Sequence, residues 1–304
     1  MNDVLDFVSR LVWWLLLPPL LPGLINKVKA WVAGRRGPPV LQLYYDLARL
    51  WQKRVVQSHV ASPAFLAGPA VAWTAVLVAA MLMPLGPVGT ALSFRGDVVL
   101  VLYLLALARF ALVWSAMETG SSFEGMGSAR EVSFSVLAEA ALIAAMLTLS
   151  VQTRSVSLAT MLAPLPGAGA VLLAAGLFTV LLAENCRVPF DDPNTHLELT
   201  MIHEVMVLDH SGPPLAVILH GAALKLLLFS VLLTESVLPV GAIAPLGGMI
   251  LLLAGVFTIT LGVGLVESLM ARFAFRRVPL LLLTAVLLCV FALLVAWQGG
   301  SVGS

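Results

Sequence analysis

Residues 279–297 read PLLLLTAVLLCVFALLVAW, a run without one charged side chain. A helix of this length rises ~28 Å, close to the ~30 Å hydrocarbon core of a bilayer. Apolar stretches of about 17 to 22 residues recur along the whole chain, as expected for membrane-spanning helices. The expected spans are residues 4–25, 64–83, 97–116, 132–150, 166–183, 214–234, 246–266 and 279–297.

The composition supports the same conclusion. Hydrophobic residues make up 60% of the chain and the mean hydropathy is +1.02, whereas ordinary soluble domains are ~45–50% apolar. The alternating pattern of a transmembrane β-barrel is absent from the sequence. The sequence predicts an all-α, polytopic protein with about eight transmembrane helices, forming a single integral membrane domain over residues 1–304.

The basic residues predict an orientation. Most of them fall in the loops at about 26–62, 117–131, 184–213 and 267–278, which follow every second span. The positive-inside rule makes these loops cytoplasmic, so both termini are expected outside the cytoplasm. In the first loop, apolar Leu43, Leu47 and Leu50 at helical spacing predict an amphipathic interfacial helix. This helix is either a topology anchor or, with Arg35, Arg36, Asp46 and Lys53, a docking site for a soluble partner.

The third of these loops is rich in titratable groups. The formal net charge is only +1 and 11% of residues are charged, yet ten Asp, Glu, His and Arg residues lie between Glu184 and His210. His203-Glu204 lacks the second histidine of the zinc-protease spacing, and Cys186 and Cys289 are too few for a cluster, so no metal site is expected. No disulfide or nucleic-acid signature is expected either.

Three charged residues lie within predicted spans. Arg109, Glu139 and Lys225 should each face the protein interior, because a charge at bilayer depth costs ~2.5 to 3.5 kcal/mol even on the lenient insertion scale. Glu131 precedes Glu139 by about two helical turns, so both carboxylates project near one face. They would form a proton relay with carboxylates nearer the cytoplasm. The alternative is a structural ion pair between Glu139 and Arg109 or Lys225.

Several motifs resemble one family, the membrane subunit shared by respiratory complex I (its subunit 1, or H) and membrane-bound nickel-iron hydrogenases. ENCRVPFD at 184–191 resembles the family's Glu-Thr-x-Arg-x-Pro-Phe-Asp segment. GSAR at 127–130, followed by Ala138-Glu139, is similar to its Gly-x-x-Arg to Tyr-Glu segment. RGP at 36–38 resembles its Arg-x-Gly-Pro loop. One departure is DHSG at 209–212, where the family has Glu-Tyr-Ser-Gly.

The run NTHLELTMIHE at 194–204 is similar to the hydrogenase branch, which includes formate hydrogenlyase subunit 4 and hydrogenase-4 component C. The resemblance implies a non-catalytic subunit in the inner (plasma) membrane of a bacterium or archaeon, which anchors a soluble electron-transfer arm and carries a proton or ion path. Implied partners are hydrogenase large and small subunits, a ferredoxin-like iron-sulfur subunit and antiporter-like membrane subunits. The iron-sulfur and nickel-iron centres would reside in these partners, with no cofactor in this chain.

The expected site residues fall into two groups. The proton path comprises Glu118, Glu124, Glu131, Glu139, Glu184, Asp191, Glu198, His203, Glu204 and Asp209. Their charge partners are Arg109, Lys225, Arg130 and Arg187. Three other functions stay open: a quinone-site subunit of an NADH dehydrogenase-type complex I, a stand-alone secondary transporter, and a structural anchor without conduction.

Overall fold

The predicted apolar stretches form helices in the computed structural model, which describes residues 2–58, 61–191 and 201–302. These residues contain helices and no strand. The α-helices are α1 (Asn2–Leu16), α2 (Leu20–Val32), α3 (Gln42–Trp51), α4 (Pro63–Leu82), α5 (Asp97–Met117), α6 (Ser122–Thr153), α7 (Leu158–Met161), α8 (Ala168–Glu184), α9 (His203–Met206), α10 (Gly212–Val237), α11 (Pro245–Leu269) and α12 (Val278–Val302). Three 3-10 turns are η1 (Gly86–Val88), η2 (Val240–Ala242) and η3 (Phe275–Arg277).

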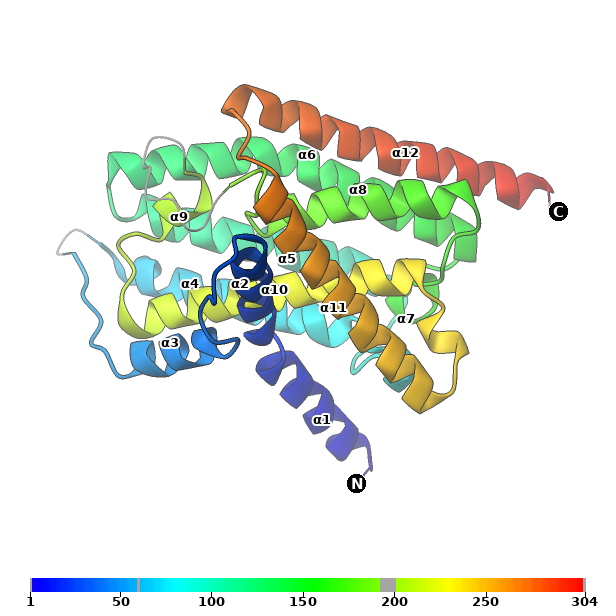
Figure 1. The fold of residues 1–304 in the computed structure, drawn as a ribbon, viewed down its shortest axis with the longest axis horizontal. Helices are drawn as coiled ribbons and strands as arrows, with labels where there is room; N and C mark the ends of the chain where they lie inside the picture. The colour runs from blue at the N-terminus through cyan, green and yellow to red at the C-terminus, as the bar shows by residue number, and fades with distance from the viewer. Residues whose placement is uncertain (1, 59–60, 192–200, 303–304) are drawn as a thin grey trace.

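The polytopic all-α fold is confirmed. Among the described residues, seven helical segments are long and apolar enough to span a bilayer, and α8 is an eighth apolar helix of 17 residues. At 1.5 Å per residue, α8 still rises ~26 Å, near the lower limit for crossing. Figure 1 shows α6, α8 and α12 running side by side, with α11 crossing the bundle diagonally.

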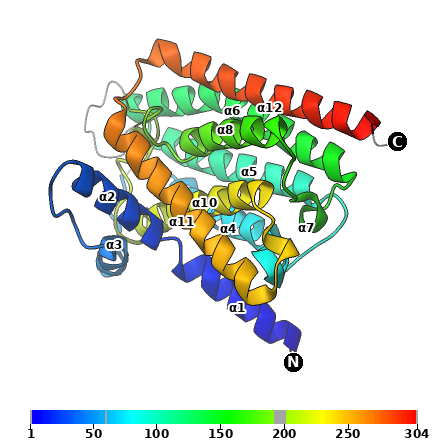
Figure 2. The ribbon, with the colours of Figure 1, turned by 45° about the vertical axis from the view of Figure 1, so that its right-hand side comes forward.

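The first expected span, residues 4–25, overlaps an apolar segment of membrane length, Phe7–Val32, but is wrong as one continuous helix. Pro18 and Pro19 separate α1 from α2, and the two helices run in different directions in Figures 1 and 2. Proline has no N–H, so carbonyls one turn earlier lose their helical donors. Pro19 removes the helical donor of the Leu15 carbonyl, and His220 Nε2 of α10 lies 3.0 Å from that oxygen. The Tyr44 hydroxyl of α3 bonds the carbonyl of Leu16 at the end of α1.

The second cytoplasmic loop was expected over residues 117–131, and most of this segment is helical instead. Helix α6 begins at Ser122, about ten residues before the expected span, and continues to Thr153. Polar residues in its first turns lowered the local hydropathy, although they are compatible with a helix that emerges from the bilayer. Glu124, Glu131 and Glu139 therefore lie on one continuous helix.

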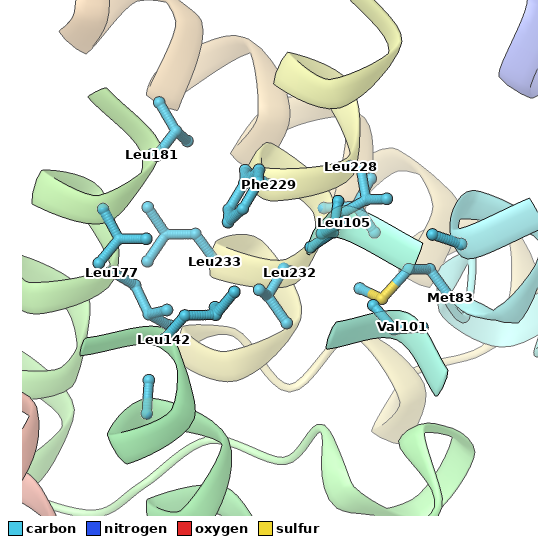
Figure 3. Close-up of a cluster of buried hydrophobic side chains, with 14 of the residues drawn as sticks. Met83, Val101, Leu105, Leu142, Leu177, Leu181, Leu228, Phe229, Leu232 and Leu233 are labelled. Atoms are coloured by element: carbon cyan, nitrogen blue, oxygen red, sulfur yellow. The ribbon is translucent and has the colours of Figure 1, made fainter. Parts of the chain in front are cut away.

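The core joins helices through leucines and small residues. Leu105, Leu142, Leu177 and Phe229 come from four different helices and meet in one cluster (Figure 3). Close approach occurs at small residues: a Cβ added at Gly68 of α4 would lie 2.7 Å from the Ala111 carbonyl oxygen of α5. Apolar lipid provides no hydrophobic drive between helices, so such close packing holds membrane bundles together.

The two ends of the bundle differ. The N- and C-termini lie at one end, which we call the terminal end (Figures 1 and 2). Helix α9 and the segments that join α2 to α4, α5 to α6 and α11 to α12 lie at the opposite end, the loop end. The predicted amphipathic helix is present as α3, which packs beside α10 and α2 at the loop end.

Candidate functional site

Arg109 of α5 is the centre of a buried charge cluster. Its guanidinium donates a 2.6 Å hydrogen bond to Glu184 Oε1 at the end of α8 and a second bond to Glu139 of α6. Its Nε lies 3.7 Å from Glu131 Oε1. The predicted side chains Arg109, Glu131, Glu139 and Glu184 thus meet, although they are up to 75 residues apart in sequence.

Lys225 of α10 completes this cluster. Its Nζ lies 2.7 Å from Glu184 Oε2, so each oxygen of this carboxylate faces a different cation. The Glu184 side chain is only 4% exposed, whereas that of Glu139 is 42% exposed. Three carboxylates against two cations leave one negative charge unmatched within the cluster.

The two larger cavities that adjoin the cluster lie on different sides of it. One of about 70 Å³ lies among α4, α5, α10 and the loop end, and Arg109, Glu131 and Lys225 are in its lining. The other, of about 300 Å³, lies between α5 and α6 and is lined by Glu139 and exposed Tyr103. Arg109 and Glu184 line both, so these two side chains separate the cavities.

Asp191 fixes the start of α9 at the loop end. Its Oδ2 accepts the backbone N–H groups of Ile202 and His203 at 2.9 and 3.0 Å, and its Oδ1 lies 2.9 Å from Arg272. Nearby, buried Glu124 accepts the backbone N–H of Asp209 at 3.2 Å. These two predicted carboxylates therefore hold both ends of the 202–209 segment by accepting backbone hydrogen bonds.

Arg187 leads to a residue that the sequence reasoning missed. It lies 3.3 Å from Glu267 near the end of α11, and Lys29 of α2 lies 2.9 Å from the other oxygen of that carboxylate. The Glu267 side chain has no exposed surface. Glu267 is the first residue of the loop expected over 267–278, so the sequence did not mark it as a charge within the membrane. The available signal was its position directly after the charge-free expected span 246–266.

The remaining predicted residues have separate environments. Arg130 donates to the Met201 carbonyl at 2.9 Å and stacks over the Phe275 ring. Glu118 lies at the end of α5, where hydrogen bonds from Ser62 and Trp114 lower the pKa of its carboxyl. Glu204 is partly buried on α9 and Asp209 is exposed.

The expected docking residues Arg35, Arg36 and Lys53 are exposed, whereas Asp46 bonds Gln42 at 3.0 Å. Glu198 lies outside the described residues.

Comparison with known proteins identifies the chain's relatives. The model of a family described as NADH dehydrogenase matches residues 5–298, nearly the whole length. The chain belongs to the NADH dehydrogenase family. Two relatives come from Escherichia coli: hydrogenase-4 component C is 30% identical, over 78% of this chain and 76% of the relative, and formate hydrogenlyase subunit 4 is 30% identical, over 86% and 88%.

A solved structure has the same fold as this chain. A chain of the membrane-bound sulfane sulfur reductase, an archaeal respiratory membrane complex, superposes with a TM-score of 0.84. The match covers 97% of this chain and 100% of that chain at 21% sequence identity. At this identity the likeness shows a shared fold, and the resemblance expected from the motifs is confirmed at the level of the family.

His210, the residue that departs from the motif of this family, is buried at the loop end. Its ring stacks on Phe65 with centroids 4.1 Å apart, and its Nε2 lies 3.1 Å from Ser115 Oγ. The Ser115 hydroxyl already donates to the Phe65 carbonyl at 2.7 Å, so His210 Nε2 is the donor in the second bond. Burial lowers the pKa of His210 to about 4. This histidine is therefore a neutral packing residue at pH 7.

His210 should make the protein acid-sensitive. Because its pKa falls from 6.5 to about 4 on folding, the stability it confers is complete above pH 6.5 and declines as the pH falls toward 4. At pH 5 the loss is about 2 kcal/mol. We expect the melting temperature of the detergent-solubilised protein to fall more steeply between pH 7 and 5 in wild type than in His210→Phe. Equal slopes would contradict this assignment.

Proposed function

We propose that this chain is the membrane-anchor and proton-translocation coupling subunit of an energy-converting hydrogenase-like or formate-hydrogenlyase-like complex. One observation supports the proposal most: three carboxylates surround Arg109, and one of them, Glu139, faces a second cavity. Such a cluster can gain or lose a proton when the position of Arg109 or Glu184 changes slightly. The relatives in Escherichia coli favour the hydrogenase branch.

In this proposal the loop end is cytoplasmic and both termini lie outside the cytoplasm, in the inner membrane of a bacterium or archaeon. The support is the distribution of basic residues, since Arg35, Arg36, Arg272, Arg276 and Arg277 all lie at the loop end. Protons would enter from this end and reach Glu131, Glu139 and Glu184 through groups that include Asp191, His203 and Glu204.

The proposed partners at the loop end are the hydrogenase large and small subunits and a ferredoxin-like iron-sulfur subunit. These partners would hold the iron-sulfur and nickel-iron centres, and this chain would hold no redox centre of its own. Support comes from the exposed positive side chains Arg35, Arg36 and Lys53, which flank the amphipathic helix α3. A basic surface of this kind suits an acidic face of a soluble subunit.

A membrane partner is proposed for the outer face between α5 and α6. Glu139 is 42% exposed there, beside exposed Tyr103. A carboxylate exposed to acyl chains is costly, so this face requires a protein neighbour or water. An antiporter-like membrane subunit packed against α5 and α6 would seal the 300 Å³ cavity and continue the proton path into the next subunit.

The quinone-site alternative gains no comparable support. The cavity that reaches the loop end, among α4, α5 and α10, is about 70 Å³, below the roughly 300 to 1,000 Å³ of small-molecule pockets. The cavity between α5 and α6 reaches about 300 Å³, but the described residues that line it belong to α5, α6 and α8, and none comes from 185–191 or 201–212. The cluster also argues against a purely structural anchor, because an anchor has no need of an unmatched carboxylate. A stand-alone transporter has no need of partner subunits, so it does not explain the surfaces that are proposed above to bind them.

Glu139→Gln tests the proposed function. The amide keeps the size of the side chain and a hydrogen-bond acceptor for Arg109, so the complex should assemble. It cannot release a proton, so coupled proton translocation in proteoliposomes should fall by at least tenfold. Glu139→Asp is the matched control, because it retains the acid and should restore a measurable part of the pumping. Unchanged proton translocation in Glu139→Gln would overturn the proposal.

A further inference from the structure

Three potential metal ligands from separate segments converge beside the charge cluster. One ligand atom each of Glu131 on α6, Cys186 after α8 and His203 at the start of α9 lies within 4.8 Å of the others. The geometry points to a binding site for a borderline-soft divalent cation, Zn²⁺ in the first place, on Glu131, Cys186 and His203. Chain spacing does not reveal this set, because the ligands are 55 and 17 residues apart.

The chemistry of the three ligands matches zinc. Thiolate, imidazole and carboxylate are the side chains that bind Zn²⁺, at about 2.3, 2.0 and 2.1 Å respectively. Ligand atoms on a tetrahedral ion at these lengths are ~3.5 Å apart, so the present set needs to close by about 1 Å. The thiolate and the imidazole exclude Mg²⁺ and Ca²⁺ as the preferred ion, since those ions take oxygen ligands.

The site has room for an ion and a water ligand. All three ligands line the cavity of about 70 Å³, and a single water needs only ~10–15 Å³ of such volume. The fourth coordination position would open into this cavity, toward apolar Ala72 and Val76 of α4. Three protein ligands with one open position are typical of accessible zinc sites, in contrast to closed structural ones.

The ligands are positioned by groups other than a metal. Cys186 has a left-handed backbone, with φ at 51°, in the turn after α8, and its N–H bonds the Ala183 carbonyl at 3.1 Å. The His203 backbone is fixed by Asp191 at 3.0 Å. Glu131 lies 3.7 Å from Arg109 Nε. Ordering the ligands before the ion arrives reduces the entropy lost on binding.

The charge of the surroundings also favours a dication. Arg109, Lys225, Glu131, Glu139 and Glu184 together carry one net negative charge when all are ionised. A bound ion converts Cys186 to its thiolate, which adds a second negative charge. Zn²⁺ brings this total to zero. The side chains of Lys225 and Arg109 are both paired with Glu184, so neither is free to take the place of the metal ion.

The test is Zn²⁺ binding to the intact complex purified from membranes. Wild type should bind one more Zn²⁺ than Cys186→Ser or His203→Gln, or bind it at least tenfold more tightly. Cys289→Ser is the control, because Cys289 is buried in α12 away from the site. Equal Zn²⁺ stoichiometry and affinity in wild type and Cys186→Ser would overturn the site.

Two further measurements test the ligand directly, and the first needs no variant. Zn²⁺ added to wild-type complex should slow the alkylation of Cys186 at least tenfold, and Co²⁺ should give a thiolate-to-cobalt absorption band that is absent in Cys186→Ser. Unchanged alkylation would refute thiolate coordination.

Coordination also removes Glu131 from the proton path, a consequence that rests on the proposed function. Zn²⁺ should therefore inhibit coupled turnover in wild type more than in Cys186→Ser; binding without inhibition would keep the site and contradict the path through Glu131.

Discussion

Replacing Arg109 by leucine is expected to prevent the protein from accumulating in the membrane. The substitution leaves the carboxylates of Glu131, Glu139 and Glu184 facing one another with only Lys225 nearby. Removing one partner of a buried ion pair destabilises a protein by about 3–5 kcal/mol, and here one guanidinium serves three carboxylates. The amount of tagged chain in membranes and its co-purification with partner subunits measure the effect.

Arg109→Lys is the matched control for this experiment. Lysine keeps the positive charge but cannot match the guanidinium's planar fork of donors, so accumulation should lie between wild type and Arg109→Leu. A second check combines Arg109→Leu with Glu139→Gln, which removes a carboxylate charge whose ion-pair partner was Arg109, and should recover part of the loss. If Arg109→Leu accumulates like wild type, the cluster does not hold α5, α6 and α8 together.

Gly127→Val should have the second-largest effect. A Cβ at Gly127 would lie 2.2 Å from Val205 Cγ1 and 2.9 Å from the Ile202 carbonyl oxygen, where α6 packs against the 202–206 segment. A branched side chain must push this segment away, and overpacking of this kind usually costs about 1–3 kcal/mol. Because the displaced segment carries His203, coupled turnover should fall more than tenfold while α6 itself stays helical.

The same helix offers the control for this prediction. A Cβ at Gly125 meets nothing within 4 Å, so Gly125→Val adds the same side chain without a clash. Limited proteolysis of the assembled complex should cut near residues 201–210 faster in Gly127→Val than in Gly125→Val. Equal cleavage rates and equal turnover in the two variants would show that this contact does not position the loop.

The membrane fold was predictable because lipid imposes a simple rule on composition and length. Each apolar run of bilayer length after the first forms a helix, and the errors lie where length and hydropathy do not decide the structure. Polar residues in the first turns of α6 lowered the hydropathy of a segment that is helical outside the apolar layer. Conversely, Pro18-Pro19 interrupts the first apolar run, because hydropathy does not record the loss of backbone donors.

The site was predictable in its members but not in its pairing. Arg109, Glu139 and Lys225 stand out in sequence, since a charge in an apolar run requires a partner. Their partners come from other helices, and only the packing angle and depth of those helices decide that Arg109 contacts three carboxylates while Lys225 contacts one. Glu267 and the Glu131, Cys186 and His203 set were missed for the same reason, as each depends on segments far apart in the chain.

The uninterrupted course of α6 has a mechanical consequence. From Ser128 to Thr153 this helix contains no glycine or proline at which it would bend. Arg130, which donates to the Met201 carbonyl, lies on this stretch ~13 Å from Glu139, which bonds Arg109. If a docked subunit tilts or slides the loop end of α6, the rigid helix carries the same movement to Glu139. The contact between Glu139 and Arg109 then shifts, and no residue between the two ends has to change its conformation.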